Sequence, residues 1–75
     1  MPRKIFRYSP QHMLQHWQQF GGQPLDFVMK SGRTWHGLLL KVENNTLHIK
    51  DMLGKLQKLP ADTLEEVVAT VATEI

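Results

Sequence analysis

The chain has 75 residues, no cysteine and a net charge of +2, so it forms one small domain without disulfides or thiolate chemistry. A domain of this size buries only about 60% of the surface that its unfolded chain exposes, and self-association is one of the few remaining ways to stabilise it. No apolar run approaches the roughly 20 residues of a membrane-spanning helix, and no apolar segment follows the basic N-terminus as in a secretory signal. We therefore expect a cytoplasmic protein with no membrane segment.

The positive charge is concentrated at the N-terminus. Residues 1–8 contain three bases and no acid, whereas six bases and seven acids nearly cancel in residues 9–75. The three bases are Arg3, Lys4 and Arg7. Phe6 and Tyr8 lie among them, and this combination is typical of a nucleic-acid-binding arm, although a solubilising tail has the same charge. We predict a basic N-terminal arm over 1–8 and a single domain over 9–75.

The segment YSPQHMLQHWQQFGG, residues 8–22, is typical of a short helix. Ser9 is a good N-cap, Pro10 suits the first helical position, and two glycines end the segment. One face of this helix is apolar and consists of Met13, Leu14, Trp17 and Phe20. Tyr8 precedes the N-cap, where its ring is expected to pack on Met13 as a hydrophobic staple.

Two histidines of this helix, His12 and His16, have the spacing of a two-histidine metal site. The metalloprotease pattern needs a glutamate after the first histidine, where this chain has Met13, and no third ligand is visible in the sequence. We expect neither metal nor cofactor. Catalysis also lacks support, because there is no cysteine nucleophile or glycine-rich phosphate loop, and Glu65 and Glu66 would point to opposite sides of a strand. We predict that the protein is not an enzyme.

After Pro24 the apolar period changes from 3.6 to 2, which predicts β-structure. The expected strands cover about 25–30, 33–43, 46–51 and 55–59. Residues 31–32 and 44–45 are expected to form tight turns. Strict alternation fails between Leu39 and Val42, which predicts a bulge near residues 40–41.

The segment from Pro60 onward permits two interpretations. Its apolar residues fit a helical stripe, and Thr63 with Glu66 resembles a capping box. However, β-branched residues dominate from Val67, which favours a strand. We predict a single turn over 60–64 followed by a strand over about 66–71, with a helix as the alternative.

Gly32 and Gly37 lie five residues apart inside the β pattern. Gly32 is expected to supply the positive φ of a hairpin turn, and Gly37 to let its strand bend over the core beneath the helix. A short sheet closes on itself only where a strand bends sharply. The sequence therefore predicts a mostly β protein, in which an N-terminal α-helix precedes a five-stranded, strongly bent antiparallel SH3-like barrel.

The segment 25–43 resembles the first signature of the Sm/LSm proteins, which include bacterial Hfq. The shared pattern consists of alternating apolar residues, two glycines, a leucine, an apolar residue and an acid. Its positions here are Leu25, Phe27, Met29, Gly32, Gly37, Leu39, Val42 and Glu43. Two departures concern the RNA site: the loop 43–47 is short and lacks an aromatic residue, and only Lys58 is comparable with the second signature.

The resemblance implies an Sm-like barrel that forms a ring of about five to seven subunits through its fourth and fifth strands and binds single-stranded RNA. The expected RNA-binding residues are Asn44, Asn45, Thr46, Lys58, Arg3, Lys4 and Arg7. The two asparagines also form a good turn, and a lone lysine is often only solvated. The alternatives are a scaffolding or protein-interaction ring that has lost the RNA site and a monomeric SH3-like accessory domain.

Overall fold

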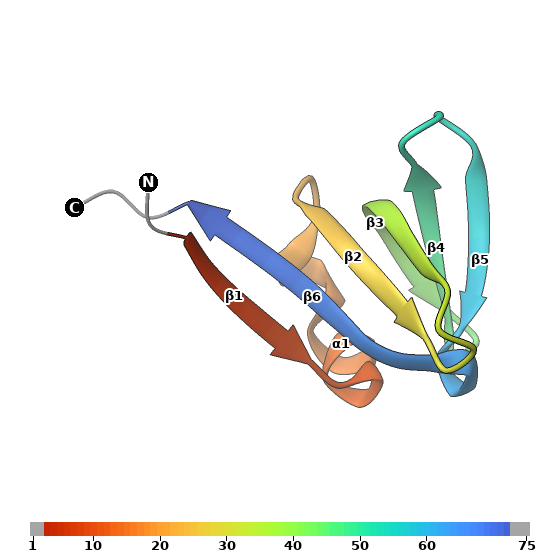
Figure 1. Ribbon diagram of the computed structural model, residues 1–75. Coiled ribbons are helices and arrows are strands. Elements are labelled where there is room, and N and C mark those ends of the chain that lie inside the picture. The colour runs from red at the N-terminus through yellow and green to blue at the C-terminus, as the bar shows by residue number, and fades with distance from the viewer. Residues whose placement is uncertain (1–2, 73–75) are drawn as a thin grey trace.

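The change of apolar period at Pro24 marks the change from helix to sheet in the computed structural model, which describes residues 3–72 (Figure 1). The elements are β1 (Arg3–Tyr8), α1 (Pro10–His16), the 3-10 helix η1 (Trp17–Phe20), β2 (Pro24–Met29), β3 (Thr34–Glu43), β4 (Thr46–Asp51), β5 (Leu56–Pro60), the 3-10 helix η2 (Ala61–Thr63) and β6 (Leu64–Ala72). The strands form one antiparallel sheet in the order β1-β6-β2-β3-β4-β5. None of the described helices is long and apolar enough to cross a membrane.

The expectation of a closed five-stranded barrel is wrong, because the sheet has six strands and no pairing in the described part of the chain closes it. The additional strand is β1, which lies in the segment expected to be an arm and pairs with β6 from Arg3↔Ala72 to Tyr8↔Val67. Isoleucine and aromatic residues favour a strand. The charges of this segment favour an exposed arm, whereas its β-branched and aromatic residues favour the strand that forms.

The predicted turn and strand at the C-terminal side are confirmed, and the alternative helix is wrong. The turn is η2, and β6 follows it directly. Val67 and Val68 pair with β1 on one side and with β2 on the other, so β6 is an interior strand at this point. Burial then alternates, with Val67 and Ala69 inside, because a strand has a period of 2.

The predicted N-terminal helix is confirmed, although its last turn tightens into a 3-10 helix. The hydroxyl of Ser9 accepts a hydrogen bond from the His12 backbone N–H at 3.1 Å, as expected of an N-cap. Met13 and Phe20 are buried from this side of the molecule. The ring of Tyr8 packs edge-on against Phe20, with ring centroids 4.8 Å apart.

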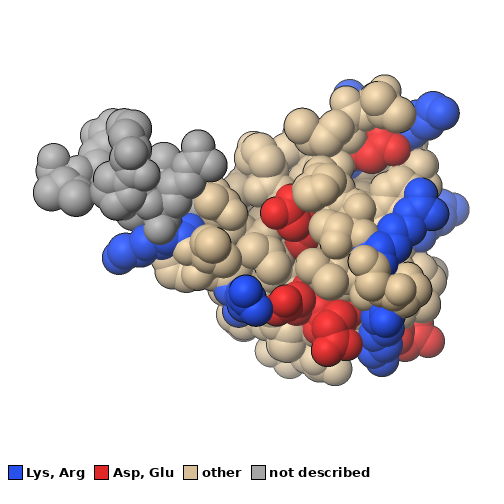
Figure 2. Space-filling view, in the orientation of Figure 1, with Lys and Arg blue, Asp and Glu red and all other residues tan. Residues whose placement is uncertain are grey.

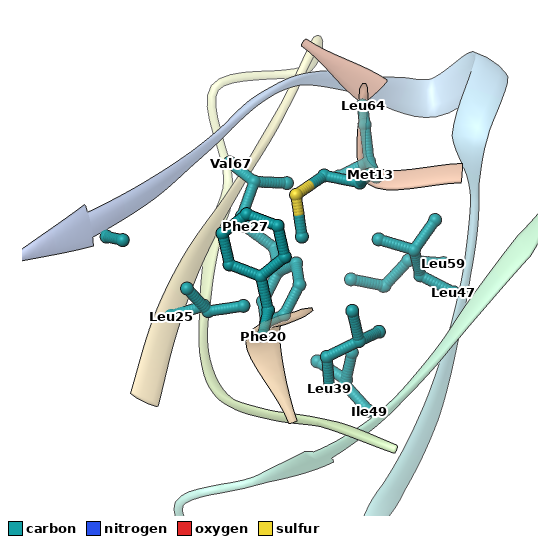
Figure 3. Packing of buried hydrophobic residues seen from close by; sticks show 11 residues of the cluster. Met13, Phe20, Leu25, Phe27, Leu39, Leu47, Ile49, Leu59, Leu64 and Val67 are labelled. Carbon is teal, nitrogen blue, oxygen red and sulfur yellow. The ribbon is translucent and has the colours of Figure 1, made fainter. Parts of the chain in front are cut away.

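The core lies between the curved sheet and the helical segment (Figure 3). Alternating apolar residues of the strands are buried: Leu25, Phe27, Leu39, Leu47, Ile49 and Leu59. Figure 3 shows Met13 and Phe20 covering these strand residues from the helical side, with Phe27 near the centre. The helix is therefore needed to complete a core that the sheet alone would leave open.

The predicted turns and bulge are also confirmed. Gly32 has φ +93°, and Asn44 and Asn45 have φ 52° and 57°, which fits the tight turn of a hairpin. The register of β3 against β4 shifts between Leu39 and Lys41. As a consequence, the core face of β3 changes from odd to even positions within one strand.

Gly37 permits a close backbone contact that differs from the predicted one. A Cβ atom at this position would lie 2.2 Å from the Lys50 carbonyl oxygen and 3.0 Å from the Asp51 Cα. The missing side chain therefore makes room for the backbone of β4 and not for the helix. Gly37 pairs with Leu25 on one side and with Asp51 on the other, where β3 passes from one neighbour to the next.

Gly37→Ala is expected to lower the free energy of unfolding by about 3 kcal/mol or to prevent folding, because the clash is with backbone that cannot rotate away. Gly21→Ala is the matched control, since its Cβ would meet nothing nearer than the Gln18 carbonyl oxygen at 3.9 Å and should change stability by less than about 0.5 kcal/mol. Urea unfolding of the two variants measures the difference. Equal stabilities would contradict the close approach of β3 to β4.

Candidate nucleic-acid interface

The outer face of β3, β4 and β5 carries a row of two lysines with a histidine between them. Lys41 pairs with His48 across β3 and β4, and His48 pairs with Lys58 across β4 and β5. Their neighbours Leu47 and Ile49 are buried, so the alternation of a strand directs the row outward. We call these three residues the cross-strand row. The lysines provide two flexible charges on one face, which is an arrangement suited to phosphate.

A groove of about 450 Å³ lies beside this row. Its lining residues are Leu40, Lys41, Glu43, His48, Ile49, Leu56, Gln57 and Lys58. Leu40 and Leu56 are 46% and 73% exposed and give the groove apolar walls. Glu43 is its one acid, and the Lys41 Nζ lies 3.3 Å from its carboxylate. The groove therefore suits a ligand that combines a flat apolar part with negative charge.

The bulge in β3 creates this groove. Leu39 faces the core opposite Ile49, and Lys41 pairs with His48 without an intervening partner for Leu40. The extra residue therefore brings Leu40 to the surface beside Lys41. The sequence predicted the bulge, but it did not predict which residues would gather around it, because β5 supplies the opposite wall.

Four of the predicted RNA-binding residues lie on this side of the molecule. Asn44 and Asn45 form the turn between β3 and β4, and the Asn45 carbonyl accepts a hydrogen bond from the Ala61 N–H at 2.9 Å. The Thr46 hydroxyl donates to the Asn44 carbonyl at 3.3 Å. Lys58 belongs to the cross-strand row. The turn role of the asparagines is confirmed, and their contact with RNA remains a prediction.

The other three predicted residues lie on β1, at the opposite edge of the sheet. Arg3 pairs with Ala72 through the backbone, and the Arg7 guanidinium lies 3.7 Å from the Glu66 carboxylate. Figure 2 shows blue side chains along β1 at the left and over β4 and β5 at the right, with acidic side chains between them. The structure therefore divides the predicted site into two surfaces.

The four histidines lie in three environments, one of which the sequence analysis missed. The Nδ1 of His36 lies within hydrogen-bonding distance of the Asp26 carboxylate, across β2 and β3. The contact could have been predicted from the sequence, because a hairpin with its turn at residues 31–32 places Asp26 opposite His36. His12 and His16 have ring centroids 4.7 Å apart. No group of three or more possible metal ligands occurs in the part of the chain that the structure describes.

Asp51 fixes the connection between β4 and β5, which borders the groove. Its carboxylate accepts hydrogen bonds from the backbone N–H groups of Lys55 at 2.9 Å and Leu53 at 3.0 Å, and from the Gln57 amide at 3.3 Å. These hydrogen bonds lower the pKa of Asp51 below the usual 3.8, and the bond from the Lys55 N–H has the largest effect. Burial of the carboxylate acts in the opposite direction but does not cancel the shift. The ionised side chain therefore holds the turn.

Comparison with known proteins found no matching family model, no matching curated protein and no matching solved structure. The likeness to the Sm/LSm family therefore depends on the pattern within residues 25–43.

Asp51→Asn is expected to reduce the acid sensitivity of folding. The pKa of Asp51 is lower in the folded chain than in the unfolded chain, so its stabilising contribution is complete above pH 3.8 and is lost as pH falls through the folded value. The variant should be less stable than the wild type at neutral pH, and the two should converge in acid. Urea midpoints measured from neutral pH to below 3.8 test this, with Glu65→Gln as a control for loss of one negative charge. A constant difference across that range would contradict it.

Proposed function

We propose that the chain is an Sm-like protein that binds single-stranded RNA on the outer face of β3, β4 and β5. The observation that carries this proposal is the cross-strand row beside a groove with apolar walls. Lys41 and Lys58 contact phosphates, and a base enters the groove between Leu40 and Leu56. The Asn44-Asn45 turn lies at the end of the same face, where its amides reach base edges.

The groove favours single-stranded RNA over a duplex. Its volume of about 450 Å³ is within the range of ligand pockets, about 300–1,000 Å³. Bases in a single strand are unstacked and enter such a pocket, whereas those of an A-form helix are inaccessible from its narrow major groove. His48, at the centre of the row, offers a further ring and hydrogen-bonding group to the ligand.

The backbone conformation and packing of the signature residues support the Sm-like assignment. Gly32 has the left-handed φ of its hairpin, and Gly37 is the point of closest approach between β3 and β4. The acid of the signature, Glu43, ends β3 directly before the Asn44-Asn45 turn. The two glycines of the resemblance therefore each have a structural reason of their own.

A ring of subunits is the second candidate, and the exposed apolar side chains favour it. Most of them lie at the two open edges of the sheet or beside them. Ile5 and Phe6 are on β1, Leu56 is on β5, and Met52 and Leu53 are in the turn between β4 and β5, whereas Leu40 is on the interior strand β3. Residues 67–72 of β6 are covered by β1, so this part of β6 is not free to pair as expected from the resemblance. The proposed contact is therefore β5 of one copy against β1 of the next. Such a head-to-tail contact must close as a ring or continue as a fibre.

The substitutions Lys41→Gln and Lys58→Gln together should weaken RNA binding and reduce its salt dependence. For single strands, the slope of log K against log salt falls by about 0.7 for each lost phosphate contact, so a decrease of about 1.4 is expected. Fluorescence anisotropy with uridine-rich and adenosine-rich oligonucleotides at several salt concentrations measures it. Lys30→Gln removes an exposed lysine near the β2–β3 hairpin and is the matched control. An unchanged slope would assign RNA binding to another face.

Native mass by light scattering tests the ring. The wild type should exceed the 8.7 kDa monomer, and Ile5→Lys with Leu56→Lys should return it to that mass, because charge is placed at both edges. Basic residues on β1 and β5 repel each other, so assembly should strengthen as salt rises from about 0.05 to 0.5 M. Ser31→Lys, which adds one positive charge at the β2–β3 turn, is a control for added charge away from both edges. A ring that ignores RNA would support scaffolding, and a wild-type monomer would exclude both ring functions.

A further inference from the structure

Four rings form a continuous array that runs from β1 onto α1. The centroids of Phe6 and Tyr8 are 6.4 Å apart with an interplanar angle of 19°. Tyr8 and His12 follow at 5.0 Å and 21°, and His12 and His16 at 4.7 Å and 41°. We call these four residues the ring array. We propose that it is a second RNA-binding site, on which unpaired nucleobases stack.

The local structure places the rings on one side of the molecule. Phe6 and Tyr8 are two residues apart on a strand, so they share a face, and His12 and His16 are one helical turn apart. The Ser9 cap fixes the junction between the strand and the helix. The array is therefore a product of β1 pairing with the sheet, and a free N-terminal arm would not form it.

A buried residue holds the middle of the array in place. Phe20 is 6% exposed and contacts Tyr8 at 4.8 Å and His12 at 6.1 Å, both in edge-on geometry. Rings that are already fixed lose little conformational freedom when a ligand stacks on them. The array is thus preorganised for binding.

The ends of the array are open to solvent. Phe6 is 41% exposed and His16 is also exposed, while Tyr8 and His12 are partly buried. Packing against Phe20 accounts for the aromatic side chains at Tyr8 and His12. It does not account for the exposed rings of Phe6 and His16 at the two ends. Stacking on a ring is worth more to a ligand than contact with an aliphatic side chain, because every nucleobase presents a flat π-face.

The surrounding charge favours a polyanion as the occupant. Residues 3–25 contain no acid, and Lys4 lies two residues before Phe6 on the same face of β1. Glu66 of the neighbouring β6 is engaged by Arg7 on the other face. Gln15 lies three residues after His12 on the helix surface and adds an exposed amide. Rings with nearby positive charge and few acids are the composition of a single-stranded nucleic-acid platform.

The inference rests on the proposed function, and in it the ring array binds nucleobases of the same RNA that the cross-strand row binds through its phosphates. The cross-strand row supplies charge on the β5 side, whereas the ring array supplies stacking at the β1 edge. An RNA long enough to contact both would gain affinity from the second contact, because it becomes intramolecular.

The experiment compares a single-stranded RNA with an abasic oligonucleotide of the same length and charge. Phe6→Leu with His16→Gln should weaken binding of the intact RNA by about tenfold, leave abasic binding unchanged and leave the salt slope at its wild-type value. His36→Gln is the matched control, because it removes an exposed ring on β3 that belongs to neither proposed site. Circular dichroism and urea unfolding confirm that each variant folds.

Each other result overturns the stacking site. If the wild type binds both oligonucleotides equally, and the lysine substitutions weaken both, RNA binding stands and stacking is excluded. If the Phe6 and His16 substitutions instead lower the native mass without affecting RNA affinity, the array contacts a second copy of the chain. If the wild type binds neither oligonucleotide, the proposed function and the stacking site both fail.

Discussion

The close approach of β3 to β4 at Gly37 is the contact on which the rest of the structure depends. The Lys50 carbonyl occupies the position that a side chain would need, so the two backbones meet at a point where other residues would keep them apart. Through this contact β3 pairs with β2 over its first half and with β4 over its second half. The resulting curvature lets a few strands enclose Phe27, and it also brings β5 beside the bulge, which creates the groove.

The strand before the helix changes what this curved sheet can do. By pairing with β6, β1 covers an edge of β6 that would otherwise be open, and β1 itself becomes the edge strand of the sheet. Its basic and aromatic side chains are thereby fixed on the surface of the sheet. Two groups of positive residues consequently lie toward opposite edges of the sheet, with acidic residues between them. Two such edges suit an RNA strand that is long enough to contact both. They also suit a second copy of the chain that pairs its β5 edge with the β1 edge of the first.

Much of the fold could be predicted because it is determined by short-range rules. The Ser9 cap, the left-handed residues of the two turns, the bulge after Leu39 and the strand after Pro60 each depend on neighbours along the chain. The strand β1 was not predicted, because its charged residues favour an exposed arm and its β propensity favours a strand. Only the pairing with β6 decides between the two. The candidate site was predicted in part: Lys58 belongs to the groove, whereas Leu40, Lys41 and His48 were not identified.

The sequence by itself determined the periods, caps and turns, since these follow from the conformational limits of single residues and their close neighbours. The tertiary structure alone decided that β6 would accept β1, that three strands would align Lys41, His48 and Lys58, and that Tyr8 would meet His12. These contacts join residues far apart in the chain or across a strand-to-helix junction. Their free energy depends on a register and a curvature that exist only after the core has formed.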